Sequence, residues 1–401
     1  MSKFLKVMIV LLTIALFASA AIASELTVKG FYQVRGISYN NLDGTDTTDD
    51  NANGIDQRVR LYFNGSANEN VKGVFVTEVD NVWGYAGAVD KDTGKPVKEV
   101  GRVGADAKGQ IEIKHAYLDV TLPDYSVNFK AGTQGFNQAN GLIIDDDAAG
   151  LKVARKFGDI EVNFMWVKIE ENSIYDDAAD MDYYTVQAAL KAGSFKLVPL
   201  VGYVNQSSTD FTNLYLGAKA EGKVAMLGLS LNAVLSDWEQ GNDDGTGIAA
   251  TAKAVVDLSG VNVYGAFGYM GDKDTATGEF RDVSNYNNFA EVLTGGKFDG
   301  RGTVGNQAVS DTYMNWIYFK AGASAKIGDK ASLEGAVIYA QQAEDVGAVD
   351  ALTYGTEVDA YYTRTLTPGA SIVVGGGYLF VDEDFGTDDA YKVGTALTVK
   401  F

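Results

Sequence analysis

Apolar and polar residues alternate along most of the chain after residue 25, which predicts β-strands with one apolar and one polar face. The last segment shows the pattern most clearly. Its large apolar side chains share one face: Tyr391, Val393, Leu397, Val399 and Phe401. Its other face carries Lys392, Gly394, Thr398 and Lys400. Such strands suit a sheet that has hydrocarbon on one side and water on the other.

Short turns alternate with longer polar stretches along the whole chain. The turns include Pro123-Asp124 and Gly328-Asp329-Lys330. The longer stretches lie near residues 40–54, 86–109, 135–146, 171–180, 207–211, 238–246, 272–311, 344–352 and 383–388. Short turns on one side and longer loops on the other are typical of an outer-membrane barrel. We predict an all-β, antiparallel, up-and-down transmembrane barrel of about 18 strands, or about 16 with one hairpin fewer, each of roughly 9–14 residues.

The N-terminus has the pattern of a secretory signal peptide. Two lysines precede the apolar run Val7–Phe17, and the A-x-A pattern Ala21-Ile22-Ala23 closes it. We expect residues 1–23 to be the signal peptide and residues 24–401 to form the barrel. The apolar run is short for a membrane-spanning helix, and no later window reaches about 18 consecutive apolar residues. If the chain crosses a membrane, strands must cross it.

The composition narrows the class of protein further. The chain holds 46 Gly, 22 Tyr and 19 Phe but only 4 Pro, and its mean hydropathy is −0.06. A transmembrane barrel has such an average because lipid-facing and lumen-facing residues alternate. The absence of cysteine excludes disulfides, thiolate metal sites and covalently attached haem, and we expect no cofactor. Loss of Lys3 and Lys6 takes the formal charge from −20 to −22, which makes nucleic acid an unsuitable partner.

Four parts of the chain together resemble a known family. They are the leader, the hairpin from Asp56–Phe63 through Val74–Glu78, the segment Ala116–Val120 and the terminal strand. In this order they resemble the general porins of Gram-negative bacteria. The resemblance implies the outer membrane, contact with its lipid and lipopolysaccharide, and passive diffusion of small polar solutes and ions through a water-filled channel. It also implies a homotrimer, although the third long loop is short, and insertion by the barrel assembly machinery with Phe401 ending the assembly signal.

Charged residues on the polar faces of the early strands are candidates for the pore lining. The basic candidates are Arg35, Arg58, Arg60, Lys130 and Lys152. The acidic candidates are Glu78 and Asp80 on the third strand and Asp145, Asp146 and Asp147 at the end of the third long loop. A basic wall that faces acidic residues would orient dipolar solutes, as the resemblance implies. The alternative is that these charges are solvated lumen residues that pair with each other.

Other candidate sites are weaker. The single histidine, His115, lies inside a predicted strand, and no serine stands in a G-x-S-x-G pattern, so we expect no catalytic site and no enzyme. The acidic stretches Asp43–Asp50 and Asn242–Gly245 are rich in oxygen ligands but lack a complete calcium-loop pattern, so we interpret them as solvated loops without metal. Aromatic residues at strand ends, such as Tyr32 and Trp83, fit an interfacial girdle, with a sugar-binding track in the pore as the alternative.

The longest polar stretch, residues 272–311, is long enough to be functional. The sequence leaves open whether it enters the pore or covers the external mouth. A diffusion channel is the leading hypothesis for the function. The alternative is a barrel that serves as a sheath or docking partner for a periplasmic or extracellular electron-transfer protein. A plugged transporter is disfavoured, because strand-like alternation begins directly after the signal peptide.

Overall fold

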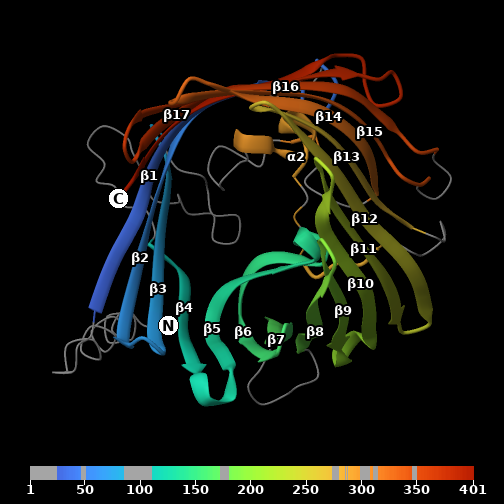
Figure 1. Cartoon of the computed structure of the whole chain (residues 1–401). Helices are drawn as coiled ribbons and strands as arrows, with labels where there is room; N and C mark the ends of the chain where they lie inside the picture. The colour runs from blue at the N-terminus through green and yellow to red at the C-terminus, as the bar shows by residue number, and fades with distance from the viewer. Residues whose placement is uncertain are drawn as a thin grey trace.

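The computed structural model describes residues 25–46, 51–84, 111–171, 180–272, 280–284, 286, 288–298, 308–309, 315–345 and 350–401. Within these residues, eighteen strands form one antiparallel sheet in which each strand pairs with its neighbours in sequence. The first strand also pairs with the last, which closes the sheet into a barrel (Figure 1). The predicted fold class and the larger strand number are confirmed. The predicted signal peptide lies outside the described residues.

The strands run in chain order around the barrel. They are β1 (Glu25–Asn40), β2 (Ala52–Asn68), β3 (Val71–Val82), β4 (Glu112–Leu122), β5 (Val127–Gln138), β6 (Ile144–Phe157), β7 (Ile160–Glu170), β8 (Met181–Ala192), β9 (Phe195–Gln206), β10 (Phe211–Val224), β11 (Leu227–Gln240), β12 (Asp243–Leu258), β13 (Val261–Asp272), β14 (Trp316–Ile327), β15 (Ala331–Gln341), β16 (Thr353–Thr367), β17 (Ala370–Val381) and β18 (Ala390–Lys400). The short helices are η1 (Pro123–Tyr125), η2 (Ala139–Gly141), η4 (Ser207–Thr209), α2 (Glu291–Thr294) and η5 (Gly296–Phe298). No helix among the described residues is long and apolar enough to cross a membrane.

Several strands extend further than the hydropathy pattern predicts. The longest, β2, has 17 residues. The stretch near 238–246 was predicted as a long loop, but β11 ends at Gln240 and β12 begins at Asp243, so the prediction is wrong there. Polar residues continue the strands in this hairpin because backbone pairing beyond the bilayer needs no apolar face. Strand length therefore exceeds the membrane-spanning length.

The last strand behaves as its alternation predicts. Val393 and Leu397 are exposed on the outer surface, whereas Lys392 and Ala396 are buried on the inner side. The chain end extends the pairing with β1, because the Gly30 N–H donates a hydrogen bond to the Phe401 carbonyl at 2.8 Å and the reverse bond is 3.0 Å. The terminal residue thus takes part in closing the barrel. Its role as an assembly signal stays a prediction.

Aromatic side chains occupy the outer surface near strand ends. Trp166 donates a hydrogen bond from its indole to Asp182 at 2.7 Å, and the Tyr378 hydroxyl donates to Asp389 at 2.9 Å. Trp166 and Tyr378 are exposed, as is Tyr203. An aromatic girdle places an apolar ring at the membrane and a polar atom toward water. The geometry favours the girdle interpretation for these residues over a track inside the pore.

The buried apolar side chains form two clusters on the inner side of the barrel. One contains Val292 and Leu293 of α2 with residues of β1 and β14–β18. The other contains Leu142 and Ile143, which follow η2, with Phe280 and residues of β5–β13. A barrel of this size otherwise encloses water. Segments that join two strands must therefore fold inward and exclude water from parts of the wall.

Candidate functional site

The connection between β5 and β6 folds into the lumen. Its turn η2 contacts β10 and β11, and the side-chain amide of Asn232 on β11 donates a hydrogen bond to the Ala139 carbonyl. Leu142, Ile143 and Ile144 are at most 2% exposed. Apolar side chains are buried in this way only when they pack against protein rather than water. This connection is thus part of the interior of the barrel.

The described part of the β13–β14 connection lies beside it. The Val283 N–H donates a hydrogen bond to the Ile143 carbonyl at 2.9 Å, and the Tyr286 N–H donates to the Gly141 carbonyl at 3.0 Å. Gly141 has a φ of +84°, and a Cβ there would lie 2.5 Å from the Tyr286 carbonyl oxygen. Only glycine tolerates both conditions. The two connections are therefore joined by backbone hydrogen bonds inside the barrel.

The beginning of this segment is fastened to β10 and β11. Asn213 and Tyr215 donate hydrogen bonds to the Arg281 carbonyl at 2.9 and 2.6 Å. The Arg281 guanidinium lies 3.8 Å from the centre of the Trp238 ring and donates to Gln240 at 2.9 Å. Trp238 is 1% exposed, and a desolvated cation–π contact is worth about 2 kcal/mol. We call these contacts the first anchor.

The end of the segment is fastened to β16 and β18 through α2. The Glu357 carboxylate accepts hydrogen bonds from the N–H groups of Val292 and Leu293 at 2.8 and 2.9 Å. It thereby satisfies N–H groups that have no partner within the first turn of a helix. At the other end of the helix, the Lys392 ammonium donates to the Gly295 carbonyl at 2.7 Å. We call these contacts the second anchor.

Aromatic packing adds to the second anchor. The Phe289 ring stacks on Tyr318 with 3.9 Å between the ring centres. The Lys320 ammonium of β14 donates a hydrogen bond to the Phe289 carbonyl at 2.6 Å. Residues 280–298, here called the strap, thus run from the wall at β10–β11 to the wall at β14–β18. Figure 1 shows α2 inside the ring of strands, so the longest connection enters the pore with its described residues.

The predicted arginines of β2 are paired on their own wall. Arg58 lies directly opposite Asp80 of β3, and Arg60 lies opposite Glu78. Both opposite pairs form salt bridges, and Arg58 also contacts Glu78 at 3.2 Å. Residues opposite each other in adjacent strands lie side by side, so Glu78 and Asp80 do not form a separate wall that faces these arginines. The alternative of mutually paired charges describes this patch.

The other basic candidates are found in different surroundings. Arg35 is bound to Asp56, and both side chains are buried. Lys130 and Lys152 lie opposite each other in β5 and β6. Lys130 reaches Asp119 at 3.3 Å, and Lys152 donates to a backbone carbonyl of β5 at 2.5 Å. Arg35 therefore stabilises the wall, whereas the two lysines line the lumen.

The acidic run at the start of β6 holds the strap rather than an opposite wall of the pore. The Asp145 N–H donates a hydrogen bond to the Ser284 carbonyl at 2.8 Å. The Ser284 hydroxyl donates to Asp146 at 2.9 Å, and Asp147 lies 2.7 Å from His115. His115 is thus a wall residue with an acidic partner. The sequence could not show this role, because Ser284 lies far along the chain.

No cluster of three or more potential metal-ligating His, Asp or Glu side chains is present in the part of the chain that the structure describes. Asp43 bonds instead to its own turn, accepting a hydrogen bond from the Thr45 N–H at 3.0 Å. Asp49 and Asp50 of the same acidic stretch lie outside the described residues. The interpretation of these acidic stretches as solvated loops stays a prediction.

Beneath η2 lies a lumenal pocket that the sequence interpretation missed. It has a volume of about 370 Å³. Its lining includes Lys152, Lys196, Lys219, Asn163 and Gln187, with Glu161 as the acidic member. The alternation in β9 and β10 already placed Lys196 and Lys219 on the polar faces of their strands. The signal was present, but only the inward fold of η2 turns these side chains into a pocket.

We expect Arg58→Ala to make the pore more cation-selective. The substitution leaves Asp80 and Glu78 with less positive charge beside them, so the local potential in the lumen becomes more negative. The ratio of cation to anion permeability should rise about twofold at low salt and less at high salt, since salt screens exposed charges. Reversal potentials under a salt gradient measure it, with Arg58→Lys as the matched control. An unchanged permeability ratio would show that ions do not pass close to this patch.

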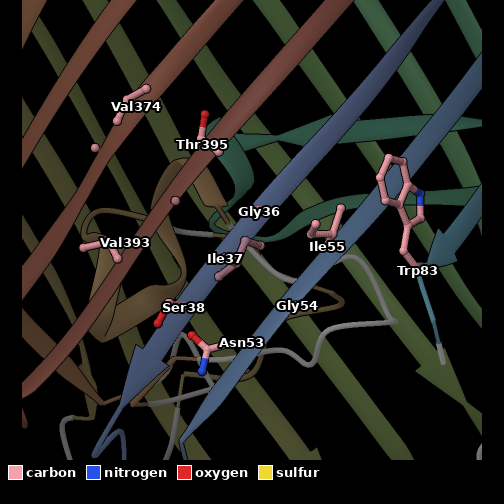
Figure 2. Close-up of a pocket in the computed structure, with 12 residues that line it drawn as sticks. Gly36, Ile37, Ser38, Asn53, Gly54, Ile55, Trp83, Val374, Val393 and Thr395 are labelled. Carbon is pink, nitrogen blue, oxygen red and sulfur yellow. The ribbon is translucent and has the colours of Figure 1, made fainter.

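A further hollow lies on the outer surface, where β17, β18, β1 and β2 run side by side (Figure 2). Its volume is about 810 Å³. It is surrounded by four exposed side chains, those of Val374, Val393, Ile55 and Trp83. Gly36 has no side chain to fill its centre. Side chains of this parity face away from the lumen. The hollow is therefore not part of a passage through the barrel.

Neither the family models nor the sequences of curated proteins match this chain. Solved structures do match it. OccK8 (OprE) of Pseudomonas aeruginosa has a TM-score of 0.59 at 9% identity, with 94% of this chain and 98% of that chain covered. OccAB4 of Acinetobacter baumannii has a TM-score of 0.58 at 9% identity, with 95% and 100% covered.

A BenF-like porin from Pseudomonas fluorescens matches in the same way, with a TM-score of 0.58, 9% identity, and coverage of 94% of this chain and 99% of that chain. Almost the whole length of each chain takes part in these matches. Sequence identity is too low to carry over a site or a solute. The expected porin resemblance is confirmed at the level of fold, and the chain has the fold of outer-membrane porins with 18-stranded barrels.

Proposed function

We propose that this protein is an outer-membrane channel through which small polar solutes and ions diffuse. The observation that carries the proposal is the inner lining of the barrel. Many outward side chains are apolar, whereas inward side chains outside the two anchors include charged and amide groups, as at Arg58, Lys130 and Gln187. A closed barrel of this size encloses an aqueous channel. The shared fold with Occ channels and a BenF-like porin supports the same function.

The inward connections define the narrow part of this channel. The strap and η2 together cover the wall from β5 through β10–β11 to β14–β18. Arg58 and Arg60 stay accessible, with 17% and 19% of their side chains exposed. The passage for solutes thus runs between the inward connections and the wall of β2 and β3. A sheath around another protein would need the lumen that these connections fill, and no observation favours it.

The lysine pocket gives this channel a finer selectivity. Three lysines line it, of which Lys219 pairs with Glu221 at 2.7 Å. The acidic member of the lining, Glu161, accepts a hydrogen bond from Asn163 at 3.2 Å. Ammonium and amide groups are donors suited to anionic or strongly polar groups of a solute. We assign the pocket as a transient binding site for small anionic solutes below the strap. The negative charge of the whole chain does not oppose this, because lining charges act at shorter range than distant loops.

Planar-bilayer recordings test the channel and its pocket together. Purified protein should give steady single-channel currents that rise linearly with voltage. The double variant Lys196→Gln, Lys219→Gln should lower the relative permeability of anions about twofold. Ser194→Ala at an exposed turn between β8 and β9 is the matched control and should behave as wild type. Folded protein without any conductance would exclude the channel, and equal anion permeability in the double variant would exclude the pocket's role.

A further inference from the structure

Three buried acidic residues meet where α2 packs on the wall: Glu291 of α2 itself, and Glu357 and Asp359 of β16. A Cβ built on Gly377 would lie 2.6 Å from Asp359 Oδ1, 2.6 Å from Glu357 Oε1 and 3.0 Å from the Cβ of Glu291. All three acidic residues are at most 2% exposed. Like charges in such a site oppose each other's ionisation unless protons or cations compensate. The small size of Gly377 makes this convergence possible.

Two lysines accompany the carboxyl groups. Lys392 lies 3.4 Å from Glu291, and Lys320 lies 3.9 Å from Asp359. With every group ionised, three negative charges face two positive ones. One proton held within the cluster makes it neutral. A buried cluster with an uncompensated charge is costly, so the neutral form is the one that favours docking.

One oxygen of the cluster shows where a proton is needed. Asp359 Oδ1 is buried and has no hydrogen-bond partner within the described part of the chain. A carboxylate oxygen can bond to another carboxylate only when a proton lies between them. Glu357 is already committed as an acceptor, because it receives two backbone N–H groups of α2. A proton shared between Asp359 and its neighbours would satisfy the orphan oxygen.

The other titratable groups around the cluster are accounted for. Tyr361 of β16 donates a hydrogen bond to Glu291 at 2.7 Å. Lys297 of η5 pairs with Glu334 of β15 at 2.5 Å, which neutralises both at the rim of the cluster. Lys253 of β12 lies over the ring of Tyr264 of β13, with 5.0 Å between the ammonium and the ring centre.

We propose that the second anchor is a proton-held latch on the strap: the neutral cluster keeps α2 docked, and loss of one proton releases α2 from the wall and widens the passage. Burial raises the pKa of the Glu291 carboxyl above its ordinary value, even though Lys392 and Tyr361 favour its ionised form. A raised pKa in the docked state means that acid stabilises docking. This stabilisation is lost as the pH rises through the raised pKa. The first anchor contains no such carboxyl cluster among its described contacts, so the strap stays attached there.

Only the predicted effect of the latch on current depends on the proposed channel function. The test therefore includes a second readout that does not need conductance. The chain contains no cysteine, and Leu293 is fully buried in α2. In Leu293→Cys, a water-soluble maleimide reaches the thiol only when α2 leaves the wall. Ser194→Cys, at the exposed turn, gives the intrinsic rate of labelling at each pH. The ratio of the two rates reports docking even in a protein that conducts nothing.

We expect this ratio to rise as the pH rises, by up to about tenfold per pH unit for one proton. Conductance of the otherwise unchanged chain should rise with it. Asp359→Asn imitates a protonated carboxyl at the oxygen without a partner and should keep the ratio and the conductance low at every pH. Asp257→Asn, at an exposed position near the end of β12, is the control and should retain the pH dependence. A constant labelling ratio in the parent Leu293→Cys protein, or an unchanged pH dependence in Asp359→Asn, would overturn the latch.

Discussion

Replacing residues 280–298 with a glycine–serine linker of equal length should raise the single-channel conductance several-fold. The linker keeps the connection between β13 and β14 but removes both anchors, since it carries neither Arg281 nor α2. A flexible linker has no apolar side chain to bury against the wall and stays in water. The barrel then offers a wider cross-section to ions, with the connection that carries η2 still inside it. Planar-bilayer recordings of wild type and variant at the same salt concentration measure the change.

The control for this replacement is a linker at η4, the turn Ser207–Thr209 between β9 and β10. It changes a connection outside the strap, and its conductance should equal that of wild type. Circular dichroism and heat-modified mobility in gels show whether each barrel has folded. A folded strap variant with wild-type conductance would mean that the strap does not narrow the passage.

The substitution Arg35→Ala should lower the free energy of unfolding by about 3–5 kcal/mol. It leaves the Asp56 carboxylate, which is 3% exposed, without the guanidinium that lies opposite it in β1 and β2. Leaving one buried charge uncompensated costs more than losing both partners. Denaturant unfolding in detergent micelles, followed by intrinsic fluorescence, gives the free energy.

Two variants separate the buried charge from other effects of the substitution. Arg35→Met combined with Asp56→Leu removes both charges and should recover most of the lost stability. Arg60→Ala breaks the pair with Glu78 at a side chain that is 19% exposed, and it should cost less than Arg35→Ala. Equal losses in Arg35→Ala and Arg60→Ala would show that burial of the first pair is not what makes it important.

The strands could be predicted because their pattern is local. Alternation with a period of two assigns each side chain to a face, and a shift by one residue would expose the whole apolar face to the lumen. The face of Lys392 and the pore side of Lys130 followed from this alone. The boundary at β11–β12 was wrong because hairpin pairing continues where the apolar pattern stops.

The lining charges were predicted as residues but not as an arrangement. Arg58 and Asp80 were both placed on polar faces, yet their pairing depends on the register between β2 and β3. The Asp145–Asp147 run was identified as acidic, but its partner Ser284 belongs to a distant connection. The lysine pocket needed η2 to cover Lys196 and Lys219. In each case the sequence showed the type of residue but not the residue that it contacts in the folded barrel.

By itself, the sequence determined a transmembrane barrel of about 18 or 16 strands with an apolar outside and a polar inside, because these features depend on short-range alternation and on the lengths of connections. Only the tertiary structure decided what fills the lumen. Glu357 binds the N–H groups of Val292 and Leu293, and Lys392 binds the Gly295 carbonyl, across 64 to 97 residues of chain. No periodicity encodes such contacts. They form because buried polar groups must find partners wherever the closed barrel brings them together.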